Sequence, residues 1–358
     1  MPFRDVIGHR RLVGLLARSV RRESLPPSLI FAGPPGVGKR LAAIATAQAL
    51  NCTAPIRADG DVPARDGLET VPFEAVASDV PYEIDACGVC AACKRVARGM
   101  HPDVLIVEPG DSGSIKIEQV RDIVDRAAYR PFEGRRRAVI IDDADALVPA
   151  AQNALLKTLE EPPPSSVFML ITARPDVLLS TVRSRCPRLR FRPLGSGDIA
   201  AAMIARGHSE AEARAVAATA DGSLERALES SAGELVDARN IAQQVLAQAA
   251  AIDDPCRRIE SAKGLLAKTG AGGAGDRKQL ALHLRAMASL LRDIELLSTR
   301  ADVRALANLD VQPAIERLTK AYEGGRGMRA FTAVDQAIGA LDRNAGVKIV
   351  ADWLVLQL

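Results

Sequence analysis

The stretch GPPGVGKR, residues 33–40, has the spacing of a phosphate-binding loop with a basic residue in its last position. In such loops, glycines let backbone N–H groups approach the phosphates at a helix start, and a lysine, here Lys39, reaches the β- and γ-phosphates. The last position normally holds a serine or threonine that ligates magnesium, but here it holds Arg40. The loop therefore predicts a nucleotide site at which ATP binding is weak or vestigial.

Two adjacent acids, Asp142 and Asp143, follow the apolar run AVII at the usual distance downstream of the loop. In an active ATPase of this kind, the first acid holds magnesium and a glutamate follows it to polarise the attacking water. Asp143 is one methylene shorter, and a general base must lie within about 3 Å of its proton. Acids that only favour a helix N-terminus are the alternative. The candidate nucleotide-binding residues are Gly33, Gly36, Gly38, Lys39, Arg40, Asp142 and Asp143.

Four cysteines have the spacing of a structural metal site. Cys87, Cys90 and Cys93 form the run CGVCAAC, and Cys52 lies upstream, just after the first long predicted helix that follows the loop. Four thiolates close a tetrahedral zinc site, whereas an iron–sulfur run would require a further Cys-Pro four residues on. That pair is absent. We predict one zinc ion bound by Cys52, Cys87, Cys90 and Cys93, with His101 as the alternative to Cys52.

These residues need a scaffold that brings strand ends and helix starts together. Apolar runs alternate with helical patterns as far as residue 194, which indicates a parallel sheet covered on both faces. Ser114 is the expected N-cap of one of these helices. The predicted strands are 29–33, 103–109, 135–147, 167–172 and 187–194, and the predicted helices are 41–50, 115–129, 150–163 and a short piece at 179–186.

Beyond residue 193 the pattern changes to helices alone. The fold class is therefore α/β plus all-α, and the chain length of 358 residues indicates two or three domains. Residues 53–86 are expected to be a long mobile insertion, and the glycine-rich residues 267–276 a flexible connection. The predicted domains are a nucleotide-binding-like domain at 1–193 with a metal-binding insertion at about 52–101, a small helical lid at 194–232 and a C-terminal helical domain at 233–358.

The composition argues against several classes of protein. Apolar residues make up 48% and charged residues 25%, which is ordinary for a globular chain. Aromatic residues make up only 3% and the net charge is +3, so neither a base-stacking platform nor a DNA-coating protein is expected. We see no signal sequence or membrane span and expect a cytoplasmic protein. The remaining cysteines, Cys186 and Cys256, are expected to be small buried residues.

The series GPPGVGK, IIDDADAL, AQNALLKTLEEPP and SRC resembles the clamp-loader branch of the AAA+ ATPases and looks most like bacterial DNA polymerase III delta-prime subunits. The resemblance covers residues 3–227 well and the rest only in size and character. It implies an AAA+ parallel-sheet domain with a zinc-binding insertion, a helical lid domain and a C-terminal helical collar domain. The chain departs from the family in the long segment between Cys52 and the cysteine triplet.

The resemblance gives Arg185, in the run Ser184–Arg185–Cys186, the role of a catalytic arginine finger that acts in the ATP site of a neighbouring subunit. A guanidinium beside a phosphate supplies fixed charge and forked donors. On composition alone, a surface arginine among its neighbours is the simpler interpretation. The family's sensor arginine in the lid is also replaced, because Glu225 stands at that position and Arg226 follows it.

The resemblance therefore implies a scaffold subunit of the DNA polymerase III clamp loader, which loads the sliding clamp onto primed DNA in replication. The implied partners are the gamma/tau and delta subunits in a pentameric ring, with no membrane contact. The chain itself would not hydrolyse ATP. The alternatives are an active ATPase motor subunit of the gamma/tau type, and an unrelated zinc-containing nucleotide-binding module. A motor subunit would have Ser or Thr at position 40 and Glu at position 143.

Overall fold

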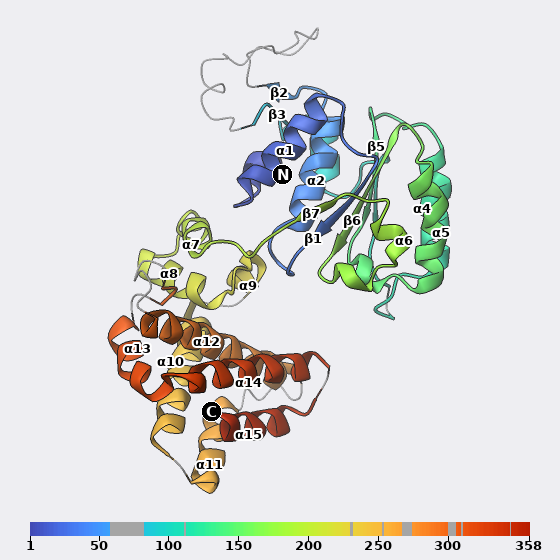
Figure 1. Cartoon of the computed structure of the whole chain (residues 1–358). Helices are drawn as coiled ribbons and strands as arrows, with labels where there is room; N and C mark the ends of the chain where they lie inside the picture. Colours follow the sequence, from blue (N-terminus) through green and yellow to red (C-terminus); the bar gives the residue numbers. More distant parts are fainter. Residues whose placement is uncertain are drawn as a thin grey trace. The chain divides into compact units, whose positions relative to one another are not determined.

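The computed structural model forms two compact units, residues 1–193 and 194–358, and each is described by itself (Figure 1). The described residues are 1–57, 82–110, 112–229, 232–252, 254–266, 274–299, 306–308, 311–343 and 345–358. Most of the insertion expected at 53–86 and of the connection expected at 267–276 lies outside these residues. Within the described part of the chain, no helix has both the length and the apolar character needed to cross a bilayer.

Unit 1 is built on a five-stranded sheet in the order β4-β5-β6-β1-β7. All neighbouring strands run parallel, and β1 lies between β6 and β7. The predicted α/β class is therefore confirmed, and the carboxyl ends of the strands meet at one edge of the sheet. The strands are β1 (Ser28–Ala32), β4 (Val104–Val107), β5 (Arg137–Ile141), β6 (Ser166–Thr172) and β7 (Arg188–Arg190).

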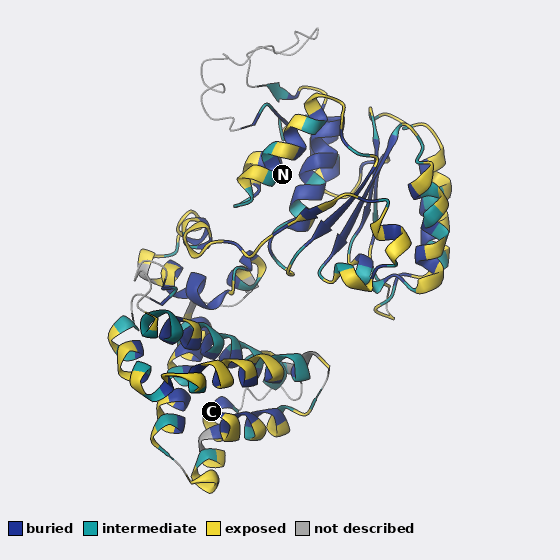
Figure 2. Ribbon diagram, in the orientation of Figure 1, coloured by how far each residue is buried: buried dark blue, intermediate teal, exposed yellow. Residues whose placement is uncertain are grey.

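Helices cover both faces of this sheet, because the strands are apolar on both sides. Leu29 and Phe31 of β1 belong to the core beneath α1 and α2, whereas Ile30 belongs to the core beneath α4, α5 and α6. Figure 1 shows the two helical layers, and Figure 2 shows the strands buried between them. The helices are α1 (Arg10–Arg21), α2 (Lys39–Asn51), α4 (Ile117–Ala128), α5 (Pro149–Glu160) and α6 (Ser180–Arg183).

A small second sheet lies beside α1 and α2. Strands β2 (Ile56–Arg57) and β3 (Ile84–Asp85) pair antiparallel, and α3 (Ala91–Ala97) follows them and packs on α2. The buried carboxylate of Asp85 accepts the backbone N–H of Phe3 at 2.7 Å and pairs with Arg4 at 3.0 Å. These contacts anchor the small sheet to the N-terminal segment. Short 3-10 turns occupy Phe3–Asp5, Ala144–Ala146 and Pro175–Val177.

Two local predictions in unit 1 are wrong. Ser114 does not cap a helix: α4 begins at Ile117 with Lys116 as its N-cap. Ile115 is held extended, since its N–H donates to the carbonyl of Ala146 and its own carbonyl accepts from Val148. The strand predicted to run to residue 147 ends at Ile141, because Asp143 adopts a left-handed conformation with φ of 50°.

Unit 2 is helical throughout its described residues, as predicted. Helices α10, α12, α14 and α15 share one large apolar core, which also buries Tyr322. One buried polar pair links elements of this unit: buried Asp293 accepts the backbone N–H and the side-chain amide of Asn308, both at 2.8 Å. The helices are α7 (Ser196–Ile204), α8 (Glu210–Thr219), α9 (Leu224–Glu229), α10 (Ala232–Ala251), α11 (Pro255–Leu265), α12 (Ala274–Ser298), α13 (Gln312–Thr319), α14 (Gly325–Asp342) and α15 (Val347–Gln357), with a 3-10 turn at Lys320–Tyr322.

The two cysteines expected to be buried behave differently. Cys186 is buried beside α6, and burial raises the pKa of its thiol to about 11. Cys256 is exposed instead, because it lies in the first turn of α11, where its backbone N–H donates to Asp254. Neither residue belongs to the cysteine cluster described below.

Candidate functional site

The phosphate-binding loop lies where β1 ends and α2 begins, at the carboxyl edge of the sheet. Gly33 is required by a close approach, since a Cβ there would lie 2.1 Å from the carbonyl oxygen of Phe191. Gly38 has φ of 97°, which favours glycine, directly before the first helical residue. The Lys39 ammonium donates to the loop carbonyls of Gly33 at 2.7 Å and Pro34 at 2.5 Å. The loop thus has the backbone shape that cradles phosphate, with the lysine folded onto it.

Arg40 lies at the centre of the acids at this edge. One guanidinium nitrogen pairs with Asp142 at 2.7 Å, and the other pairs with Glu108 at 2.5 Å. Asp142 directly follows β5 and Glu108 directly follows β4, so neighbouring parallel strands supply the two carboxylates. In a hydrolysing site the Asp142 position holds the magnesium ion. Here the side chain of Arg40 supplies the cation, so the residues of the loop fit phosphate but those of the metal position do not fit magnesium.

The neighbouring charges raise the pKa of both Arg40 and Asp143. Burial works to lower the pKa of Arg40, but the charges and hydrogen bonds of Asp142 and Glu108 outweigh it and raise that pKa. Burial and the nearby charges of Asp142 and Asp145 raise the pKa of Asp143. Arg40 is therefore locked in its charged form. Asp143 is exposed, its side chain is short and its backbone is left-handed. These features suit a general base poorly.

A second polar group at the same edge was not identified from the sequence. Asp145 accepts the hydroxyl of Thr172 at 3.0 Å and pairs with Arg174 at 3.2 Å. Thr172 ends β6, the strand between β5 and β1. The signal was available for Glu108 and Thr172 alike, because polar residues that end neighbouring parallel strands come together at one edge.

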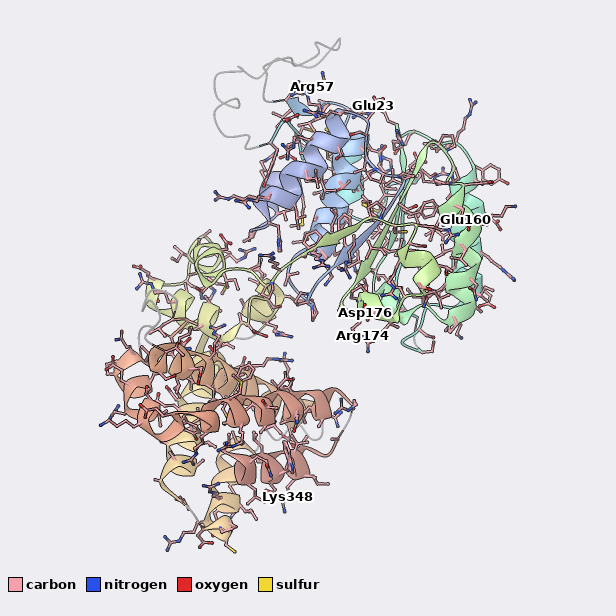
Figure 3. The ribbon with its side chains drawn as sticks, viewed as in Figure 1. Glu23, Arg57, Glu160, Arg174, Asp176 and Lys348 are labelled. Carbon is pink, nitrogen blue, oxygen red and sulfur yellow. The ribbon has the colours of Figure 1, made fainter. Side chains whose placement is uncertain are left out.

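The candidate finger, Arg185, lies just after α6. Its guanidinium donates to the carbonyl of Thr181 at 2.8 Å and pairs with Glu160, the last residue of α5. A third of the Arg185 side chain is exposed, as is half of the Glu160 side chain, at 33% and 49%. The LEEPP and SRC stretches, separate in the sequence, thus meet at the surface of unit 1. Figure 3 labels Glu160, the last residue of α5.

The residues expected to mark the lid lie in unit 2. Glu225 is exposed on α9, and Arg226 pairs with Asp221 at 3.4 Å. Asp221 has a left-handed backbone with φ of 50° in the DGS break, as the turn composition indicates. Arg226 is thus held by an acid within its own unit.

Four cysteines come together between α2 and α3. The sulfur atoms of Cys52, Cys87, Cys90 and Cys93 all lie within 4.8 Å of one another. A zinc tetrahedron with Zn–S bonds of about 2.3 Å has sulfur–sulfur edges of about 3.8 Å. The Cys52–Cys90 and Cys87–Cys93 separations are 3.9 Å and 4.0 Å, so the donor set fits zinc.

The backbone of the cluster also favours thiolates. The N–H groups of Cys87, Cys90 and Cys93 donate to the sulfurs of Cys52, Cys87 and Cys90, at 3.3, 3.3 and 3.4 Å. The thiols interact strongly, since the hydrogen bond with Cys52 lowers the pKa of Cys87 and raises that of Cys52 to about 12. Bound zinc would hold all four as thiolates and tie β2, β3 and α3 into one module.

His101 is engaged elsewhere. Its Nδ1 accepts the backbone N–H of Asp103 at 3.1 Å, and its Nε2 lies 3.4 Å from Glu133. Burial lowers its pKa. The fourth member of the cluster is therefore Cys52, and the alternative ligand His101 is not part of the cluster.

Comparison with known proteins gives a family for part of the chain. Residues 73–195 match the family described as DNA polymerase III, delta subunit. The delta' subunit of Pseudomonas aeruginosa is 36% identical over 43% of this chain and 39% of its own length. The Bacillus subtilis delta' subunit is 33% identical over 51% and 47%, and the Bacillus subtilis tau subunit is 29% identical over 68% and 38%. The chain thus spans less than half the length of these relatives.

Solved structures are similar at lower identity. A gamma subunit-related protein of Thermotoga maritima aligns over 95% of this chain and 96% of its own, with a TM-score of 0.38 and 15% identity. The clamp loader delta protein of Bacillus subtilis aligns over 96% and 98%, with a TM-score of 0.33 and 11% identity.

Proposed function

Since residues 73–195 belong to the DNA polymerase III delta-subunit family and the chain is a homologue of delta' and tau subunits, we propose that it is a delta-prime scaffold subunit of a clamp loader. It would act with gamma/tau and delta subunits in a pentameric ring that loads the sliding clamp onto primed DNA. Its own ATP site would not hydrolyse nucleotide.

The observation that carries this proposal is the double ion pair of Arg40. Its guanidinium bridges Asp142 and Glu108, so a magnesium ion would have to displace a fixed side-chain cation. Phosphoryl transfer depends on metal ions that bridge the β- and γ-phosphates. Asp143 in place of glutamate removes a second requirement. The loop and Lys39 remain suited to phosphate, which supports weak nucleotide binding without turnover.

Arg185 supplies what such a subunit would contribute to a neighbour. Its side chain is presented at the surface by α6 and held by Glu160 through a single carboxylate. An arginine brought to a neighbour's γ-phosphate stabilises transition-state charge and contributes large rate factors. The pair with Glu160 orders the side chain before assembly, and the exchange of that carboxylate for phosphate would complete the neighbouring site.

Unit 2 offers a surface suited to a helical collar. Ile349, Trp353 and Leu356 recur on one face of α15 at helical spacing, and they are exposed at 73%, 38% and 40%. On α14, which packs against α15, Met328 and Phe331 are exposed at 59% and 39%. Clustered exposed apolar side chains of this size mark interaction sites. These helices would therefore supply contacts to the neighbouring subunits of the loader.

The zinc ion would have a structural role in this subunit. Cys52, Cys87, Cys90 and Cys93 would fill all four tetrahedral positions, which leaves no open position for a substrate. The ion would therefore supply folding free energy to the β2–β3 module and no catalytic chemistry.

The experiment compares single variants of this chain within a reconstituted loader. Arg185→Ala should lower the clamp- and DNA-stimulated ATPase of the loader at least tenfold while leaving assembly unchanged. Arg183→Ala is the matched control, since it removes another surface arginine two residues away that pairs with Asp176. Lys39→Ala in this chain should change the rate less than twofold. A motor subunit of the gamma/tau type, favoured by the tau homologues, would give the opposite pattern, with Lys39 critical and Arg185 dispensable.

A further inference from the structure

A second cationic site lies at the opposite end of the sheet from the phosphate-binding loop. A cavity of about 370 Å³ opens between the ends of α1 and α2, the β2–β3 pair and the segment before β5. Leu25 precedes β1 and Val167 lies near the start of β6, so the cavity is at the amino ends of the strands. A five-residue strand is about 16 Å long, which separates this cavity from the loop.

Among the described residues, four arginines line the cavity and Glu23 is the single carboxylate that does so. Arg21 comes from α1, Arg57 from β2, and Arg135 and Arg136 from the segment before β5. Figure 3 labels Arg57 and Glu23 at this end of unit 1. Arginines from three parts of the chain therefore line one space.

Among the described residues, the hydrogen-bonding capacity of Arg57 and Arg136 is only partly used. Arg135 caps α2, donating to the carbonyls of Leu50 and Cys52 at 3.1 and 3.2 Å. Arg136 donates to the carbonyl of Pro164 at 3.1 Å, which engages one of its five N–H groups. The Nε of Arg57 is buried and has no hydrogen-bond partner among the described residues. A buried N–H donor without an acceptor is destabilising, so an anionic acceptor at this position would remove that penalty.

We propose that this cavity binds a phosphate-bearing anion of nucleotide size, separately from the phosphate-binding loop. The forked donors of arginine match phosphate oxygens in pairs. Glu23 and Glu83, which lies 4.0 Å from Arg21, offset part of the charge, and the remaining positive excess still selects an anion. Apolar side chains complete the lining, as expected for small-molecule sites of a few hundred Å³. They include Val20, Leu25, Leu50, Ile84 and Val167.

The test uses the full chain and inorganic pyrophosphate as the probe, measured by calorimetry at low salt. A Lys39→Ala background disables the phosphate-binding loop, so binding in that background reports on other sites. We expect one pyrophosphate to bind, and Arg57→Gln with Arg136→Gln to weaken that binding at least tenfold. Arg126→Gln is the matched control, because it removes an exposed arginine elsewhere in unit 1 and should change affinity less than twofold.

Two further measurements test the role of the guanidinium groups and the identity of the anion. Arg57→Lys with Arg136→Lys keeps the charge but loses the fork, so an intermediate loss of two- to fivefold is expected with an unchanged unfolding midpoint. A nucleoside triphosphate and a single-stranded oligonucleotide are then compared as competitors, and the one that displaces pyrophosphate identifies the source of the phosphate. The proposal is overturned if the Lys39→Ala chain binds no pyrophosphate, or if the control variant weakens binding as much as the double variant.

Discussion

Replacing Arg40 by serine should convert a metal-independent nucleotide site into one that uses magnesium. In the native chain, magnesium can reach Asp142 only by breaking the two ion pairs that the Arg40 guanidinium makes. The Arg40 and Glu108 side chains are 47% and 50% exposed and Asp142 is 14% exposed, so solvent screens both pairs. Exposed pairs contribute about 0.2–1 kcal/mol each, and the two together oppose the metal by about 0.4–2 kcal/mol.

That free energy corresponds to a factor of about 2–30 in affinity. Arg40→Ser removes the competing cation and restores the hydroxyl that ligates magnesium in a complete loop. We therefore expect magnesium to tighten ATP binding about 2- to 30-fold in the variant. In the native chain, magnesium should leave the affinity unchanged or weaken it.

The assay is calorimetric titration with ATP in excess magnesium and again in EDTA. Arg183→Ser is the matched control, since it removes a paired surface arginine away from the loop and should behave like the native chain. The reasoning is refuted if magnesium already tightens binding to the native chain, or if Arg40→Ser shows no dependence on the metal. Binding of ATP by neither chain would refute the loop as a phosphate site.

Three shorter predictions concern the rest of the molecule. Cys52→Ser should reduce bound zinc from one per chain in the presence of a competing chelator, whereas Cys256→Ser, at an exposed cysteine outside the cluster, should not. Asp103→Asn should destabilise unit 1 in urea unfolding at pH 7, because the buried carboxylate accepts three backbone N–H groups and pairs with Arg137. Burial opposes these contacts, yet they lower the pKa of Asp103 to about 2. The stabilisation, about 2 kcal/mol, is therefore complete above about pH 4 and lost as pH falls towards 2, and the gap to the variant should close over that range. Ile349→Glu should prevent co-elution with other loader subunits on gel filtration without unfolding the chain, whereas Lys348→Glu on the same helix should not; Figure 3 labels Lys348.

The scaffold of unit 1 could be predicted from the sequence because its signals are local. Apolar runs of five to seven residues become β1, β5 and β6, and the glycine loop fixes where α2 begins. The N-cap at Ser114 was wrong for a nonlocal reason. Ile115 bonds to Ala146 and Val148, some thirty residues away, and those bonds delay the helix by two residues. Helix propensity is a local preference and does not include such tertiary hydrogen bonds.

The candidate site shows the same difference between local signals, which can be predicted, and nonlocal contacts, which cannot. Each residue of the loop could be named from its spacing, and so could each cysteine of the cluster. The carboxylate partners of Arg40 and Arg185 could not be assigned, because neither the strand end at Glu108 nor the LEEPP stretch that holds Glu160 indicates which arginine it meets. Glu108 meets Arg40 only because β4 lies beside β5 in the sheet, and strand order is not readable from periodicity. The sequence shows that a magnesium ligand is missing, whereas the structure shows that a cation takes its place.

The two arginines of the site, Arg40 and Arg185, differ in the number of carboxylates with which they pair. Arg40 has two carboxylate partners and a raised pKa, so its charge is fixed within its own loop. Arg185 has one carboxylate partner, Glu160, at the surface. A single surface pair contributes at most about 1 kcal/mol, which a bound phosphate can replace. The chain would thus keep the Arg40 guanidinium in its own loop, whereas the Arg185 guanidinium would contact the phosphate bound by a neighbouring subunit. Glu160→Gln tests this division directly: it should leave magnesium-free ATP binding by the isolated chain unchanged, yet alter the finger-dependent ATPase of the assembled loader. An equal effect on both measurements would contradict it.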